Sequence, residues 1–597
     1  MRTVIKILLF GLSTYTLSGQ VEFSKIPQYL QLFARDSNNN GHFEVQGYSP
    51  FPGTIRTVVS EMTGSVVIQT LSKPVKSYET FTLQHTIPAC LKNYQLEVFL
   101  KENGKAEHRE KLVLGLVAGD FFIVDGQSNA ECPSHESTYR HDSSYYNPFT
   151  RVIGSSFAVA TALSQDATYP IQSVGRDCEF KRPSSDSYIH GDYGFSGIWP
   201  LTLQSELANE TGIPNCFING SQGSTLIRQH FASHTPSVED SLVHSTGAYN
   251  KPKAFIYDRI YKKLSANDAV KGVKGIFWYQ GESDGNTERD SSLNYGKNFE
   301  TLYTSWKADY PSLKKIVVLQ LNLGCGGEYH NLVREIQRKL PQRYHDVAVM
   351  STVGSPFSDR DADGCHYTIA GYTRLAKKLL PLAKKYMYNF PLDEEIILPA
   401  NIQRAYYSSA NEICIEFNKN IQLQDSCIYP SPQAGIAYMK DYFFKTLSEK
   451  IHINSLRVEA NKIFLNLNLK ETEVKNISYL PPIFSNIPSV YSGPWILTEA
   501  NPELGAFAFT EFPVEQREEQ ASVFVFPNPA KTEVALKFQE EEFNTIWLYD
   551  SYGKLLTTAN IAQRNSFLNV ETLSSGIYIL RVKSATGNFC SVKIVIE

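Results

Sequence analysis

The sequence predicts a multi-domain protein in which a central α/β domain with a parallel sheet is flanked by β-sandwich domains. Its 597 residues are enough for about three to five domains. Both flanks consist of short strand-like segments separated by Gly, Pro, Asn and Lys. Between them, strand-like and helix-like segments alternate, which is typical of a parallel sheet covered on both faces.

Residues 1–19 have the pattern of an export signal peptide. Arg2 and Lys6 give a charged start, the apolar run ILLFGLSTYTL follows, and Ser18 and Gly19 are small residues before a cleavage point. The run is shorter than the ~20 residues that a membrane span needs. No Cys lies near the cleavage point, so the sequence does not predict a lipid anchor. No later segment is a transmembrane candidate.

The flanking regions predict three β-sandwiches. Residues 20–113 contain the strand candidates HFEVQGY, TIRTVVSEM, SVVIQTL, YETFTL and YQLEVFL. Residues 391–514 return to this pattern with EICIEF, KIHINSLRVEA and KIFLNLNL. Residues 515–597 begin with the charged linker EQREE and predict a small C-terminal β-sandwich between VFVFPNPA and CSVKIVIE.

Residues 114–390 form the predicted α/β domain. The run LVLGLVAGDFFIVDG has the continuous apolar character of a buried strand, and VKGIFWYQG, KKIVVLQLN and DVAVMSTVG are further strand candidates. Apolar residues at helical spacing mark IWPLTLQSELANETG, AFIYDRIYKKLSA, NLVREIQRKLPQRY and TIAGYTRLAKKLLPLAKKYM as helices.

Composition excludes some classes of function. The net charge of -4 and the pI of 6.4, without a dominant basic stretch, argue against a nucleic-acid partner. Nine Cys without a C-x-x-C pair do not suggest a metal knuckle. Export permits disulfides, but the odd count leaves at least one thiol unpaired in a monomer. Cys325 and Cys365 are attractive partners if their loops meet.

Ser128 is the first candidate for chemistry. It lies in VDGQSNAECP, directly after the apolar run FFIV, and sites in α/β sheets form beyond the carboxyl ends of strands. A serine nucleophile needs a base within hydrogen-bond reach and an acid that orients the base. Without these, GQSN is simply a turn that uses Gly126 and Asn129.

Asp363 and His366, in DADGCHYTIAGY, can supply that base and acid. Three residues apart on one loop, the carboxylate can hold the ring Nδ1–H while Nε2 points outward. The alternative is a helix-capping Asp beside an incidental His. The spaced Asp residues do not form a calcium loop, because the EF-hand template requires an acid where this chain has Ala370.

Ser283 is a rival nucleophile. Together with Gly281 and Gly285 it matches G-x-S-x-G and follows a predicted strand. A nucleophile elbow opens a helix directly, however, and here NTERDSS precedes the next helical pattern. Gln280 in the same loop suggests another use, since a side-chain amide at a strand end can donate to the oxyanion of a tetrahedral intermediate.

The loop NGSQGSTLI, residues 219–227, could expose backbone N–H groups to an anion, with Gly223 free of side-chain obstruction. Neither a P-loop nor a G-x-G-x-x-G motif is present, so nucleotide binding is disfavoured. Together, the loops after four strands supply a nucleophile, an N–H donor, an amide donor and an Asp/His pair. This is the set that a hydrolase needs.

GDFFIVDGQSNA, NGSQGSTLI, WYQGESD and DGCHYTIAGYTRLA, in this order, resemble the sialate O-acetylesterase-like branch of the SGNH hydrolases, which also contains bacterial acetyl xylan esterases. The resemblance covers roughly residues 114–388 and implies a three-layer, flavodoxin-like α/β domain. It implies that Ser128 is the nucleophile, His366 the base and Asp363 its orienting acid.

The same resemblance implies an oxyanion hole formed by the backbone N–H of Ser128, by Gly223 and by Gln280, with Glu282 as a hydrogen-bonding support. The chain departs from the family at two places. Ala130 stands where Met is usual, and Gln222 precedes Gly223 where Gly-Gly is frequent. The second departure leaves open which N–H group faces the oxyanion.

The C-terminal pieces FPNPAKTEVALKF, IWLYDSYGKLL, LSSGIYILRVKS and KIVIE resemble the C-terminal sorting domain of the type IX secretion system of Bacteroidetes. Such domains are commonly removed after the outer membrane is crossed. The alternative is an Ig-like carbohydrate-binding module. With the signal peptide, the resemblance implies passage through the periplasm to the outer membrane exterior or the medium.

The sequence therefore predicts a secreted serine esterase that removes O-acetyl groups from a sugar, such as sialic acid or a plant or host polysaccharide, through an acyl-enzyme and without metal or cofactor. The alternative is a non-catalytic carbohydrate-binding surface protein. A thioesterase or lipase is disfavoured by the polar, aromatic loop YRHDSSYYNPF. Its Tyr139, Tyr145 and Tyr146 could stack on a sugar ring or simply pack.

Overall fold

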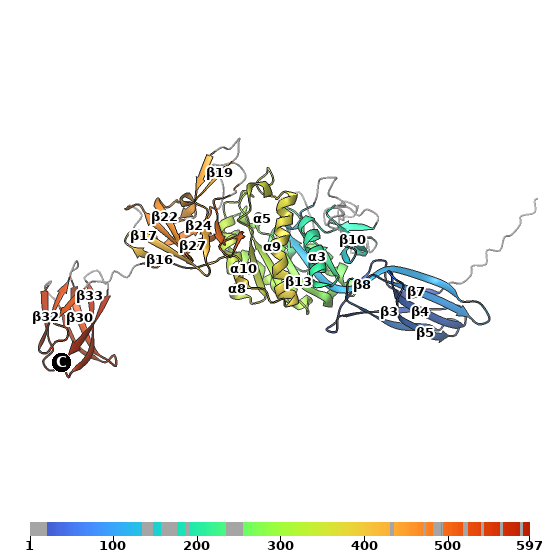
Figure 1. Ribbon diagram of the computed structural model, residues 1–597, viewed down its shortest axis with the longest axis horizontal. Helices are drawn as coiled ribbons and strands as arrows, with labels where there is room; N and C mark the ends of the chain where they lie inside the picture. The colour runs from blue at the N-terminus through green and yellow to red at the C-terminus, as the bar shows by residue number, and fades with distance from the viewer. Residues whose placement is uncertain are drawn as a thin grey trace, which may run out of the picture.

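The computed structural model is built from four β-rich parts that follow one another along the chain (Figure 1). It describes residues 21–133, 147–156, 176–186, 192–233, 255–429, 435–469, 473–481, 491, 493–516, 523–538, 543–560, 565–584 and 589–597. The predicted signal peptide, most of the EQREE linker and the three tyrosines after Ser128 lie outside these residues.

The N-terminal part consists of antiparallel strands around one apolar core. One sheet contains β1 (Glu22–Lys25), β3 (Asn40–Tyr48) and β6 (Thr80–Pro88). Opposite it, β4 (Gly53–Glu61) pairs with β5 (Val67–Val75) and β7 (Tyr94–Glu102). Side chains along β6 alternate between buried and exposed, as expected where one sheet face is solvated.

Strand β8 (His108–Gly126) joins the N-terminal and central parts. Its first residues pair antiparallel with β7, and its later residues pair in parallel with β2 (Leu32–Ala34), β12 and β13. The half of β8 inside the central sheet is buried throughout, which explains its uninterrupted apolar run. The boundary predicted between residues 113 and 114 falls within this strand.

The central sheet has the order β11-β10-β9-β12-β8-β13-β14-β15. From β9 to β15 all neighbours pair in parallel, so their carboxyl ends meet at one edge. The remaining strands are β9 (Thr150–Ile153), β10 (Phe180–Ser184), β11 (Tyr193–Phe195), β12 (Asn215–Asn219), β13 (Val273–Tyr279), β14 (Lys315–Gln320) and β15 (Val347–Ser351).

Helices pack on this sheet, and α3 and α9 lie side by side (Figure 1). The longer ones are α3 (Ile198–Thr211), α4 (Phe255–Ser265), α7 (Tyr295–Asp309), α8 (His330–Arg343) and α9 (Ile369–Tyr388). Short helices are α1 (Ser128–Glu131), α5 (Glu282–Gly285), α6 (Arg289–Leu293) and α10 (Glu394–Ile397). No helix within the described ranges is both long and apolar enough to cross a membrane.

The described residues of the third part form four small sheets. Their strands are β16 (Ile402–Ser409), β17 (Glu412–Phe417), β23 (Lys462–Leu467) and β22 (Ile453–Glu459); β18 (Ile421–Leu423), β25 (Ile496–Thr498) and β26 (Asn501–Gly505); β21 (Phe443–Phe444), β24 (Asn476–Tyr479) and β27 (Phe509–Pro513); and β19 (Ser426–Tyr429) with β20 (Gly435–Tyr438). Its core includes Leu323 and Val353 of the central part, whereas Leu504 and Phe507 enter the central core.

Within its described ranges, the C-terminal part has its own core and two antiparallel sheets. They are formed by β28 (Val523–Phe526), β29 (Glu533–Phe538) and β32 (Asn565–Asn569), and by β31 (Leu555–Asn560), β30 (Phe543–Asp550), β33 (Gly576–Ser584) and β34 (Phe589–Ile596). The prediction of a multi-domain, β-rich chain is thus confirmed.

Candidate active site

Ser128 stands at the carboxyl end of β8, between the ends of β12 and β13. The chain leaves the strand at Gly126, where φ is 142° and a Cβ would lie 2.1 Å from the Tyr279 carbonyl oxygen. Only glycine fits this close backbone approach. The turn places Ser128 as the first residue of α1, above the centre of the parallel edge.

His366 connects Ser128 to Asp363. Its Nε2 lies 2.8 Å from Ser128 Oγ, and its Nδ1 lies 2.5 Å from Asp363 Oδ2. The three side chains therefore form a continuous hydrogen-bonded chain, although 238 residues separate Ser128 from His366. The His366 side chain is 35% exposed, so the chain of hydrogen bonds is open to a ligand.

The loop before α9 holds Asp363 in place. Asp363 Oδ1 accepts hydrogen bonds from the backbone N–H groups of Cys365 (2.8 Å) and His366 (2.9 Å). Partial burial pushes the pKa of Asp363 up, but the hydrogen bonds from His366 and Cys365 and the charge of His366 together leave the pKa below its ordinary value. The N-cap of α9 is Thr368, which accepts from the Gly371 N–H, so Asp363 does not cap the helix.

Two backbone N–H groups near Ser128 bear on oxyanion binding. None of the described residues accepts a hydrogen bond from the Ser128 N–H. Gly223 follows β12 and lies beside the nucleophile, since a Cβ on it would be 3.6 Å from Ser128 Cβ. Its N–H, however, donates to Glu131 Oε2 at 2.9 Å. Of these two N–H groups, that of Ser128 has no acceptor among the described residues, whereas that of Gly223 is taken by Glu131.

Gln280 is buried after β13, and its amide is used within the protein. Its Nε2 donates to the Thr225 carbonyl oxygen (2.9 Å) and to Asp284 Oδ2 (2.6 Å). Because these contacts take both amide hydrogens, the arrangement gives no support to the expectation that Gln280 donates to an oxyanion. Instead, the amide ties the loop after β12 to the loop after β13.

Ser283 lies in α5, which begins at Glu282. This helix lies within the G-x-S-x-G segment and has only four residues, and the next helix, α6, begins at Arg289 within NTERDSS, so helical structure starts earlier than the sequence predicted. The Ser283 N–H donates to Gln127 Oε1 at 3.1 Å. Among the described residues, no histidine or carboxylate forms a hydrogen bond with the Ser283 hydroxyl, so the rival serine lacks a base.

The sequence pointed to Asn129 only as a turn residue, but its side chain belongs to the site. Its Nδ2 donates to Glu282 Oε1 at 2.9 Å and to the Cys365 carbonyl oxygen at 3.4 Å. Its Oδ1 accepts from the Tyr372 hydroxyl at 3.0 Å. One side chain thereby ties the nucleophile turn to the other loops of the site. Its position directly after the nucleophile was the one signal available in the sequence.

Three buried carboxyl groups surround the nucleophile turn. Burial is the main cause that raises the pKa of Glu131 and of Glu282 to about 7, and that of Asp284 to about 6. Glu282 Oε2 has no hydrogen-bond partner among the described residues. Glu282 is therefore a buried support of Asn129. Within the described ranges, no three His, Cys, Asp or Glu side chains are arranged to hold a metal ion.

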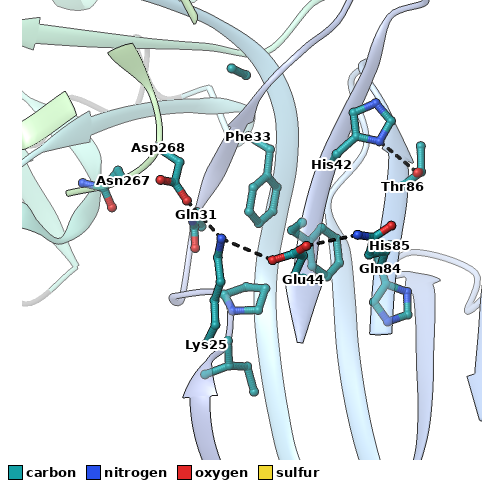
Figure 2. Close-up of a pocket in the computed structure, with 14 residues that line it drawn as sticks. Lys25, Gln31, Phe33, His42, Glu44, Gln84, His85, Thr86, Asn267 and Asp268 are labelled. Carbon is teal, nitrogen blue, oxygen red and sulfur yellow. Dashed lines mark hydrogen bonds and ion pairs between the residues drawn. The ribbon is translucent and has the colours of Figure 1, made fainter. Parts of the chain in front are cut away.

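A pocket of about 480 Å³ lies elsewhere, where strands of the N-terminal part meet Asn267 and Asp268 of the central part (Figure 2). Lys25 crosses it, 3.6 Å from Glu44 and 3.3 Å from Asp268, and Gln84 donates to Glu44 (Figure 2). The polar groups of this pocket are largely paired with one another, and none of the predicted site residues lines it.

Residues 216–387 match the family described as "Carbohydrate esterase, sialic acid-specific acetylesterase", and residues 524–597 match "Secretion system C-terminal sorting domain". A probable carbohydrate esterase of Arabidopsis thaliana is 30% identical over 136 residues, which are 23% of this chain and 48% of the relative. The chain thus spans about half the length of that curated relative.

The crystal structure of a carbohydrate acetylesterase from Xanthomonas citri is similar in fold, with a TM-score of 0.52 and 16% sequence identity. The similarity covers 81% of this chain and 98% of that one. A sorting domain of the matched kind indicates secretion or cell-surface display. The predicted resemblance to the sialate O-acetylesterase-like carbohydrate esterases, with a secretion sorting domain at the C-terminus, is therefore confirmed.

Proposed function

We propose that this protein is a secreted serine carbohydrate esterase that releases acetate from an O-acetylated sugar, such as a sialic acid or a plant or host polysaccharide. The observation that carries the proposal is the hydrogen-bonded chain from Ser128 through His366 to Asp363. It is the arrangement that activates a serine hydroxyl without a metal. We assign the central domain to the SGNH hydrolases on the same grounds.

In the acylation step, Ser128 Oγ attacks the acetyl carbonyl carbon while His366 Nε2 takes the hydroxyl proton. Asp363 holds Nδ1–H and stabilises the imidazolium that forms. The bond between the carbonyl carbon and the sugar oxygen then breaks, and His366 returns the proton to that oxygen. Water, deprotonated by His366, attacks the acyl-enzyme and releases acetate, which regenerates Ser128.

The oxyanion of each tetrahedral intermediate needs donors beside Ser128. The free backbone N–H of Ser128 is the first, and one such donor contributes ~3 kcal/mol to transition-state stability. Gly223 is the second, provided that Glu131 releases its N–H. Gln280 and Glu282 act as supports, since they link the loops that carry these donors.

Substituting Ser128 tests the proposal directly. Ser128→Ala should reduce release of acetate from p-nitrophenyl acetate and from acetylated sugars to background, because no other described hydroxyl is bonded to His366. Ser283→Ala is the matched control and should keep most of the activity, because no described histidine or carboxylate is bonded to its hydroxyl. A fluorophosphonate probe should label the wild type and not Ser128→Ala. The opposite pattern would move the nucleophile to Ser283.

Acetate release from acetylated sialic acids, xylans and pectins would then rank the natural substrates. A protein that binds these sugars but neither labels with the probe nor releases acetate would be a carbohydrate-binding surface protein instead.

A further inference from the structure

The loop that carries Asp363 and His366 is joined covalently to a second loop. Cys365, between the two residues of the pair, forms a disulfide with Cys325, which follows β14. The two Cα atoms are 4.3 Å apart and 40 residues separate them in sequence. The sequence made these two cysteines attractive partners if their loops meet, and the loops do meet. Both cysteines are partly exposed, so a soluble reductant can reach the bond.

The outer side of this loop faces solvent. Asp361, Ala362 and Asp363 are exposed, and the apolar core resumes only at Tyr367. Arg360 Nη2 donates to the carbonyl oxygens of Leu323 and Cys365, both at 3.1 Å. The bond to Leu323 bridges the same two loops as the disulfide does, so it depends on the loops remaining together, whereas the bond to Cys365 lies within one loop.

The two loops pack closely against each other, so their separation would displace residues of the site. A Cβ on Gly324, where φ is 115°, would lie 1.9 Å from the Gly364 carbonyl oxygen. Cys365 also offers its carbonyl oxygen to Asn129, the residue after the nucleophile. A shift of Cys365 would therefore move His366 relative to Ser128, and misplacement of a catalytic group by about 1 Å can cost about 100-fold in rate.

We propose that Cys325 and Cys365 are positioning residues whose disulfide keeps His366 and Asp363 aligned with Ser128, so that the esterase reaches full activity only after export to an oxidising compartment. This inference rests on the proposed function. Formation of the bond removes two electrons and two protons from the two thiols, which a disulfide-bearing oxidant outside the cytoplasm accepts. In the reducing cytoplasm the thiols remain separate and the loop is untethered.

The test uses the full mature chain and a water-soluble phosphine, which reduces the disulfide and, unlike a thiol, does not cleave the ester substrate. Thiol alkylation with mass analysis confirms reduction, and circular dichroism confirms that the fold persists. We expect kcat for p-nitrophenyl acetate to fall about 10- to 100-fold on reduction, with KM changed much less, and to recover on reoxidation. Labelling of Ser128 by the fluorophosphonate probe should slow by a similar factor.

Cys325→Ser should reproduce the reduced state and be insensitive to the phosphine. Cys90→Ser is the matched control, since Cys90 lies in the N-terminal part and in no disulfide; it should behave as the wild type. If verified reduction only lowers the melting temperature and leaves kcat unchanged, the disulfide is a structural brace and the inference is overturned.

Ser128→Ala separates the two proposals. If that variant is inactive while reduction has no effect, only the inference on the disulfide fails. If Ser128→Ala still releases acetate, the proposed function itself fails.

Discussion

At the scale of single residues, Glu131 competes for a donor that the proposed reaction needs. Its carboxylate accepts the Gly223 N–H, and burial raises its pKa to about 7, partly opposed by that hydrogen bond and by the positive charge of Arg259. Because the protonated acid is a weaker acceptor than the carboxylate, the N–H is more available to an oxyanion below about pH 7. Glu131 thereby links oxyanion stabilisation to pH.

We therefore predict that Glu131→Gln shifts the pH profile of kcat/KM. The wild type should lose activity between about pH 7 and about pH 8.5 as Glu131 ionises, whereas the uncharged amide should keep its activity over this range. Steady-state rates on p-nitrophenyl acetate, corrected for spontaneous hydrolysis, measure the effect. Superimposable profiles for the two proteins would show that the Gly223 N–H is not used.

Asp363→Asn tests the orienting acid. The amide can still contact the ring, but it no longer stabilises the imidazolium or the required tautomer, so kcat should fall about 100- to 10,000-fold. Asp361→Asn in the same loop is the control, because that side chain bonds to the Ala362 N–H rather than to His366. Equal rates for both variants would remove Asp363 from the mechanism.

At the scale of elements, the segment after β13 contains two buried carboxyl groups, those of Glu282 and Asp284. The pKa values of Glu282 and Asp284 are raised to about 7 and about 6, above the ordinary values of 4.5 and 3.8, because burial disfavours the charged forms. The folded state then binds protons more tightly than the unfolded chain does. The unfolding free energy should accordingly be highest below the ordinary pKa values, at about pH 4, fall as the pH rises, and level off above about pH 7.

Glu282→Gln should reduce this dependence on pH, since the amide oxygen can still accept from Asn129 but cannot ionise. Urea unfolding at about pH 5 and about pH 8 measures the difference. Glu288→Gln, on the exposed end of the same segment, should retain the wild-type slope. An unchanged slope in Glu282→Gln would mean that Glu282 does not titrate in this range.

The elements also show what the sequence could predict. Apolar runs identified β8, β13, β14 and β15 but not the parallel strand β9. The rule that sites form at the carboxyl ends of strands led to Ser128, which follows β8. The pairing of Asp363 with His366 followed from their local spacing. The direction of the Gln280 amide and the contact of Glu131 with Gly223 depend on partners far along the chain, so periodicity carried no sign of them.

At the scale of the whole molecule, the parts depend on one another to different degrees. The central and third parts exchange core residues, and Gln320 forms reciprocal hydrogen bonds with the backbone of Ala508, at 2.9 and 3.1 Å. Thr510 adds hydrogen bonds to Glu335 and Asn331 of α8. In contrast, the described core residues of the C-terminal part all lie between Val523 and Ile596.

Truncation should expose this difference. A protein ending at residue 516 should keep kcat/KM within about two-fold and an unchanged melting temperature for the esterase part, because it retains the shared core while losing the sorting domain. A protein ending at residue 390 should aggregate or unfold, because Leu323, Val353 and Gln320 lose the residues that cover them.

Calorimetry of the full chain should separate the unfolding transition of the C-terminal domain from that of the other domains. If loss of residues 517–597 instead lowered the stability or activity of the esterase part, the C-terminal domain would have to contribute to the fold as well as to sorting.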